Sequence, residues 1–90
     1  MPERVVTEKV PGGKLLRIKV DYSGTINSVK ITGDFFLHPE EAINDIEKSL
    51  VGAKADDVLG IVTRVVQEKG IELIGVTPDS IASVIRSAMQ

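Results

Sequence analysis

The sequence predicts an α+β domain: an antiparallel sheet of about three strands, followed by three helices packed on one face of that sheet. Two observations favour this fold. The first part of the chain alternates apolar and polar residues between short glycine-containing turns. The second part carries apolar residues at helical spacing, together with helix start and stop signals. When strands come first and helices after, the helices are expected on one side of an antiparallel sheet.

The first two strands are expected at residues 4–10 and 14–22, joined by the turn signal PGG at 11–13. The first segment is rich in β-branched residues and alternates weakly. The second alternates cleanly, with Arg17, Lys19 and Asp21 on the opposite face from the apolar residues Leu16, Ile18, Val20 and Tyr22.

A third strand is expected in INSVKITGDF, residues 26–35, after a hairpin turn in which Gly24 adopts a positive φ. Val29 and Ile31 should point inward. Ile26 breaks the alternation, which indicates a β-bulge or an irregular start of the strand.

The first helix should begin with Pro39 in its first position, because Pro, Glu40 and Glu41 all suit a helix N-terminus. Gly52 stands where this helix should end. Its apolar stripe consists of Ala42, Ile43, Ile46 and Leu50.

The second helix should start near Asp56 and Asp57 and end at Gly70, although its β-branched residues would also suit a strand. The third has the best signals, with Thr77 as N-cap and Pro78 in the first position. Residues 71–76 are expected to form a short strand or an extended connection.

Length and composition limit the function classes. Ninety residues make one small domain, residues 1–90, with a net charge of −2 and no cysteine. Disulfides and thiol chemistry are therefore excluded, and no cluster of roughly five to eight basic residues indicates nucleic-acid binding. No apolar run approaches the ~18 residues of a membrane span, and MPERVV is not a signal peptide, so a cytoplasmic location is expected.

The residues of a self-contained active site are missing. His38 is the only histidine, no nucleophile-elbow pattern accompanies it, and a zinc site would need more ligands. PGGKL lacks the first glycine and the Ser or Thr of a phosphate-binding loop. The paired acids near helix starts suit helix dipoles, and a paired-carboxylate enzyme is the minor interpretation. For Asp34, a local turn-forming hydrogen bond to the backbone is favoured over direct ligand contact. The residues thus favour a binding module or an accessory subunit.

The segment EKVPGGKLLRIKVDYSGTINSVKITGDFFLHPEEAINDIEKSLVG, residues 8–52, resembles the accessory domain of lipoate–protein ligase. The specific motifs are GGKLLRIKV, the hairpin Gly24, ITGDFFLHPEEAI and SLVG, and the helix after VTPD fits more loosely. This domain is C-terminal in many bacterial ligases and a separate small subunit in some archaea. The limits of the chain fit a free-standing subunit, as they would a domain excised from a longer ligase.

The resemblance implies a non-catalytic subunit that forms a heterodimer with the catalytic subunit of the ligase. Together they would activate lipoate with ATP to lipoyl-AMP and lipoylate a lysine on lipoyl domains of 2-oxoacid dehydrogenases and on the glycine cleavage H protein. ATP, Mg and lipoate would be used by the complex, and none would be bound by this chain alone. The implied fold is shared with sulfur-transfer scaffold proteins, but those use a cysteine that this chain lacks.

The expected partner interface lies at the strand-to-helix corner GDFFLHP. By strand alternation Phe35 and Phe36 should point to opposite faces, one into the core and one toward a partner, although both could be buried. A basic sheet face is the second candidate, and is either solvated or faces acidic or phosphate groups of a partner. The predicted interface residues are Gly33, Asp34, Phe35, Phe36, His38, Arg17, Lys19 and Lys30.

Two other functions are kept open. The chain could be an adaptor that binds lipoyl domains or another protein without a role in adenylation, or an independent small enzyme. A stable complex with a catalytic subunit is required only if the chain is the accessory subunit of the ligase. Activity without a partner is expected only if the chain is an independent small enzyme.

Overall fold

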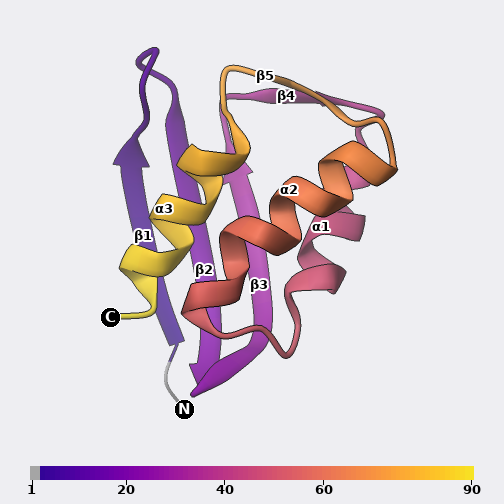
Figure 1. Cartoon of the computed structure of the whole chain (residues 1–90). Helices are drawn as coiled ribbons and strands as arrows, with labels where there is room; N and C mark the ends of the chain where they lie inside the picture. The colour runs from indigo at the N-terminus through magenta and orange to yellow at the C-terminus, as the bar shows by residue number, and fades with distance from the viewer. Residues whose placement is uncertain (1–2) are drawn as a thin grey trace.

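A computed structural model of the chain describes residues 3–90 (Figure 1). Three strands, β1 (Glu3–Lys9), β2 (Leu15–Ser23) and β3 (Thr25–Gly33), form an antiparallel sheet in the order β1-β2-β3. Two short strands, β4 (Phe36–His38) and β5 (Glu72–Ile74), form a separate antiparallel ribbon. The helices are α1 (Ala42–Leu50), α2 (Val58–Glu68) and α3 (Pro78–Ala88), and a 3₁₀ turn at Ala55–Asp57 precedes α2.

The predicted α+β fold is confirmed. All three helices lie on one face of the three-stranded sheet, and the β4–β5 ribbon crosses beyond one end of it (Figure 1). The ribbon brings the segment after β3 beside the segment between α2 and α3. Of the two alternatives expected for residues 71–76, the short strand is the one observed, and it pairs with the corner after β3.

The alternation predicted for β2 decides which face is buried. Leu16, Ile18 and Val20 are fully buried under the helices, whereas Lys19 is exposed on the other face. The predicted bulge is confirmed as a register shift, because Asp21 pairs with Ser28 while Tyr22 pairs with Ile26. The extra residue returns Ile26 to the inner face, where its side chain is buried.

The predicted start of the first helix is wrong. α1 begins at Ala42, and Pro39 lies in the turn before it, where its carbonyl accepts a hydrogen bond from the Ala42 N–H at 3.0 Å. The reason is that His38 still belongs to the paired strand β4, so the chain must turn before a helix can start. The predicted stop is correct, because Gly52 follows the helix with φ of 88°.

The other two helices follow the sequence signals. α2 begins after the 3₁₀ turn that contains Asp56 and Asp57. α3 starts with a reciprocal capping box, in which the Ser80 N–H donates to Thr77 Oγ1 at 3.1 Å and the Thr77 N–H donates to Ser80 Oγ at 2.9 Å.

One apolar cluster joins the inner face of the sheet to the three helices. Its largest fully buried side chains are Leu16, Ile18, Ile26, Ile46, Leu50, Ile81, Ile85, Val20, Val58 and Val62. No polar or charged residue among residues 3–90 is buried, so the interior holds no preformed polar site. Within the same residues, no helix has both the length and the apolar character needed to cross a membrane.

Candidate partner interface

The corner after β3 begins with a glycine that the packing requires. A Cβ at Gly33 would collide with the carbonyl oxygen of Leu15 and would lie 3.0 Å from Cδ1 of Phe35. Asp34 then closes the end of the sheet, because its Oδ1 accepts a hydrogen bond from the Leu15 N–H at 2.7 Å and its own N–H donates to the Leu15 carbonyl at 3.3 Å. Asp34 therefore bonds to the backbone as expected, but across the strands and not within its own turn.

The two adjacent phenylalanines point to opposite sides, as strand alternation predicts. Phe35 is half-buried against the core cluster and lies beside Gly33 and Gly75. Phe36 is 67% exposed. The alternative that both rings are buried is wrong, and Phe36 is the outward one.

The β4–β5 ribbon gives Phe36 a neighbour that the sequence did not indicate. Phe36 is paired with Ile74, which is 51% exposed, so the two form an apolar pair on the outer face of the ribbon. The inner face is formed by the half-buried pair of Leu37 and Leu73. Exposed large apolar side chains that lie together, and not singly, are typical of contact surfaces.

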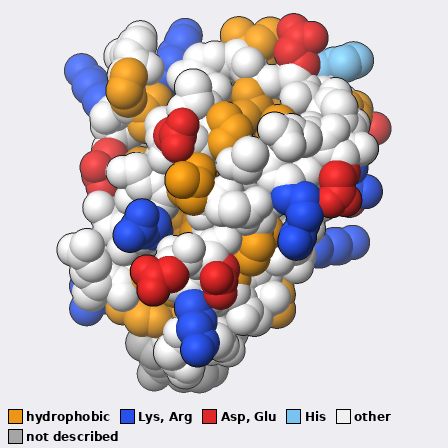
Figure 2. Space-filling view, viewed as in Figure 1, with side chains coloured by type: hydrophobic (Ala, Val, Ile, Leu, Met, Phe, Trp, Pro, Cys, Tyr) orange, Lys and Arg blue, Asp and Glu red, His pale blue; other side chains and the backbone are white. Residues whose placement is uncertain are grey.

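A polar pair adjoins this apolar pair. His38 is opposite Glu72, both side chains are exposed, and both lie on the same face as Phe36 because alternate strand residues share a face. Figure 2 shows the histidine at one edge of the molecule, close to acidic and hydrophobic side chains. The outer face of the ribbon therefore combines an exposed apolar pair with an adjacent polar pair, and protein–protein contacts contain both kinds of side chain.

The predicted basic residues lie on a different surface. Arg17, Lys19 and Lys30 are exposed on the sheet face that the helices leave uncovered. Lys19 and Lys30 are directly opposite one another across β2 and β3, an unfavourable arrangement of like charges. Glu3 offsets part of it, with Oε2 at 3.8 Å from Lys19 Nζ.

The structure thus divides the predicted interface residues between two surfaces. Gly33, Asp34, Phe35, Phe36 and His38 form the corner, and the three basic residues form the open sheet face. Sequence analysis missed Ile74 and Glu72. The alternation within residues 71–76 indicated a possible strand, and in such a strand Glu72 and Ile74 share one face.

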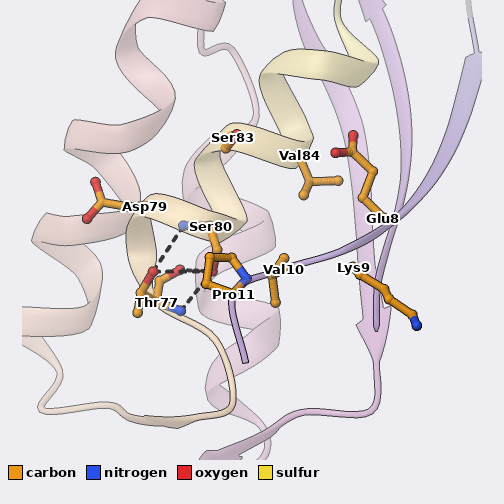
Figure 3. A pocket seen from close by; sticks show the side chains of 9 residues that line it. All are labelled: Glu8, Lys9, Val10, Pro11, Thr77, Asp79, Ser80, Ser83 and Val84. Atoms are coloured by element: carbon orange, nitrogen blue, oxygen red, sulfur yellow. Dashed lines mark hydrogen bonds between the residues drawn. The ribbon is translucent and has the colours of Figure 1, made fainter. Parts of the chain in front are cut away.

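Two further features of residues 3–90 bear on a possible site. Residues 3–90 contain no cluster of three or more potential metal ligands. A groove of about 290 Å³ lies between the end of β1 and α3 (Figure 3). Its hydroxyl groups at Thr77 and Ser80 are occupied by the capping box, so they cap α3 and are not free for a ligand.

Comparison with known proteins identifies the family to which the chain belongs. No family model matches the sequence. A curated protein of Thermoplasma acidophilum, lipoate-protein ligase A subunit 2, is 33% identical over 73 residues, which cover 80% of this chain and 77% of the relative. The chain belongs to the family of lipoate–protein ligase A subunit 2.

A solved structure supports the same assignment. A chain from a structural study of an archaeal lipoylation system, described as a bipartite lipoate protein ligase and its E2 lipoyl domain from Thermoplasma acidophilum, superposes with a TM-score of 0.78. It is 26% identical, and the match covers 92% of this chain and 96% of that one. The family resemblance of residues 8–52, including the likeness to a separate small subunit, is confirmed.

Proposed function

We propose that this protein is the non-catalytic subunit of a two-subunit lipoate–protein ligase. It would be required with the catalytic subunit for ATP-dependent activation of lipoate to lipoyl-AMP and for transfer of the lipoyl group to a lysine on lipoyl domains. The observation that carries the proposal is the similarity over most of the chain to a curated subunit 2 of such a ligase.

The corner is the proposed docking site for the catalytic subunit. Phe36 and Ile74 would supply the apolar anchor, and His38 and Glu72 the polar rim. Aromatic side chains that fill a partner's pocket commonly contribute most of the binding free energy of an interface. Gly33 and Asp34 would act indirectly, because they fix the end of β3 and thereby the direction of the ribbon.

Docking would act on catalysis by positioning. Contact with the corner would order the residues of the catalytic subunit around ATP, Mg and lipoate, exclude water and hold the reacting groups together. Transfer from preformed lipoyl-AMP would then need this subunit less than activation does. The basic face of Arg17, Lys19 and Lys30 would form a second contact with acidic or phosphate groups, since an anion would relieve the opposed lysines.

The test measures lipoate-dependent release of pyrophosphate from ATP by this chain, by the catalytic subunit, and by their mixture. Activity only in the mixture is expected. Full activity of the catalytic subunit alone would reduce this protein to an adaptor, and activity of this chain alone would make it an enzyme. Transfer from preformed lipoyl-AMP is measured in parallel, and equal dependence of both steps on this chain would contradict a specific role in activation.

The same assay tests the docking site. Phe36→Ala should weaken binding to the catalytic subunit by about tenfold or more and raise, by a similar factor, the concentration of this chain needed for activity. It should not unfold the chain, because the ring is 67% exposed. Val51→Ala is the matched control, since Val51 is 55% exposed but lies after α1 and outside the corner. Equal effects of the two substitutions would remove the corner from the interface.

A further inference from the structure

The two outer edges of the three-stranded sheet are treated differently. The outer edge of β3 is closed by the chain itself. The Ile31 N–H donates to Oε2 of Glu47 at 2.8 Å, the Ile26 N–H donates to the Ala53 carbonyl at 2.9 Å, and the Gly52 N–H donates to the Ile26 carbonyl at 2.7 Å. Helix α1 and the loop after it therefore occupy this edge.

The outer edge of β1 is open. Within residues 3–90, no hydrogen bond reaches the outer side of the strand Glu3–Lys9, and six of its seven side chains are exposed. A seven-residue strand with a free edge is a template for the addition of another strand. Charged side chains reduce indiscriminate pairing at such an edge, and their order along the strand determines which partner strand fits.

The hairpin defines which backbone groups are free. The Val10 N–H donates to the Lys14 carbonyl at 2.9 Å, and hydrogen-bonding direction alternates along a strand. Arg4, Val6 and Glu8 therefore bond to β2. The free N–H and C=O groups on the outer edge belong to the odd positions Glu3, Val5, Thr7 and Lys9.

We propose that this edge binds the same strand of a second copy of the chain. The two β1 strands would pair antiparallel about a two-fold axis at Val6, which joins the two sheets into one. In this register the odd positions face odd positions, as the free backbone groups require, and about eight inter-copy hydrogen bonds form. The opposed residues are Glu3 with Lys9, Arg4 with Glu8, Val5 with Thr7, and Val6 with Val6.

The sequence of charges favours a second copy over any other strand. ERVVTEK is self-complementary when it is paired with its own reverse, because each acid then faces a base. A shift of the pairing by two residues in either direction would preserve the backbone hydrogen bonds. One shift places Glu3 opposite Thr7, the other places Glu8 opposite Val6, and neither places any acid opposite a base. A two-fold interface is built from one patch used twice, and self-complementarity is its requirement.

The surroundings of the edge leave room for this pairing. Glu8, at the end of β1, is one of the residues that line the groove of about 290 Å³ between β1 and α3 (Figure 3). Arg4 of the second copy would reach Glu8 from the open side of this groove. In its own chain Glu8 is opposite Leu16 and Arg4 is opposite Val20, so neither charged group has an ionic partner across β2.

The proposal is independent of the ligase function and is tested on the full chain alone. Sedimentation equilibrium over a roughly hundredfold range of concentration should show a monomer–dimer equilibrium. Arg4→Glu places acid opposite acid twice in each dimer and should weaken dimerisation by about tenfold or more. The double variant Arg4→Glu/Glu8→Arg restores opposite charges and should recover the original dimer. Arg64→Glu on α2, remote from β1, should leave dimerisation unchanged.

Amide hydrogen exchange identifies the edge and its occupant. Exchange at Val5, Thr7 and Lys9 should slow as the chain is concentrated, whereas exchange at Arg4, Val6 and Glu8 should change little. A chain that stays monomeric over the whole range, or a double variant that fails to recover, would overturn the proposal. So would protection of the odd positions only after a catalytic subunit is added, because the edge would then belong to that partner.

Discussion

β1 and β3 are the two edge strands of one sheet, and they differ in what covers their free backbone groups. Glu47, Gly52 and Ala53 bond to the outer side of β3, whereas no described residue bonds to that of β1. The difference shows that the domain uses its own hydrogen-bonding groups to cover only one of the two edges. It encloses the edge next to α1 and the corner, and protects the other edge only with charge.

The comparison also separates positioning from contact. The enclosed side ends in Gly33 and Asp34, which fix the direction of the ribbon that presents Phe36 and Ile74. On the open side, the outer edge of β1 has backbone N–H and C=O groups that are available to a partner strand. Substitutions on the enclosed side should therefore lower stability, and substitutions on the open side should change association with little effect on stability.

The largest effect is expected at the end of β3. Gly33→Ala should lower the free energy of unfolding by about 3 kcal/mol, because the new methyl group would collide with the Leu15 carbonyl and press on the ring of Phe35. Denaturant unfolding measures this. Gly60→Ala is the control, since that helical position is open, and it should raise stability by about 0.5–1 kcal/mol. Equal effects would show that the corner is not tightly packed.

An intermediate effect is expected along the enclosed edge. Glu47→Ala should lower the free energy of unfolding by about 2 kcal/mol, because the Ile31 N–H loses the Glu47 carboxylate as its acceptor in a partly buried site. Glu47→Gln keeps an oxygen acceptor and should lose much less. Glu68→Ala, which removes only a surface ion pair with Arg64 at 3.6 Å, should change stability by less than about 0.5 kcal/mol. If Glu47→Ala lowers the free energy of unfolding no more than Glu68→Ala does, water replaces Glu47 as the acceptor of the Ile31 N–H without loss of stability.

Sequence patterns predicted the elements whose signals are local. The alternation in β2, the hairpin at Gly24 and the capping of α3 by Thr77 each depend on a few neighbouring residues, and all are confirmed. Pro39 was misplaced because its local signal is that of a helix start. The pairing of His38 with Glu72, which keeps the chain extended up to the proline, joins residues far apart in the sequence.

The residues of the candidate interface were also predicted only where the signal is local. Alternation predicted that Phe35 and Phe36 would face opposite ways, but not which one would be outside. That was decided by tertiary packing at Gly33, whose missing side chain leaves space for the ring of Phe35. The neighbours Ile74 and Glu72, and the closure of β3 by Glu47, depend on tertiary contacts that no local pattern specifies.

The smallest effect on stability is expected at the open edge. Thr7→Pro should lower the free energy of unfolding by less than about 1 kcal/mol in dilute solution, because the Thr7 N–H points away from β2, and proline is tolerated at such positions. Val6→Pro, one residue earlier, removes a bond to β2 and should cost several times more. Thr7→Pro should also abolish self-association, since it removes a donor from the paired edge. Equal losses for the two prolines would show that the outer side of β1 is already bonded, and the contrast between the two edges would disappear.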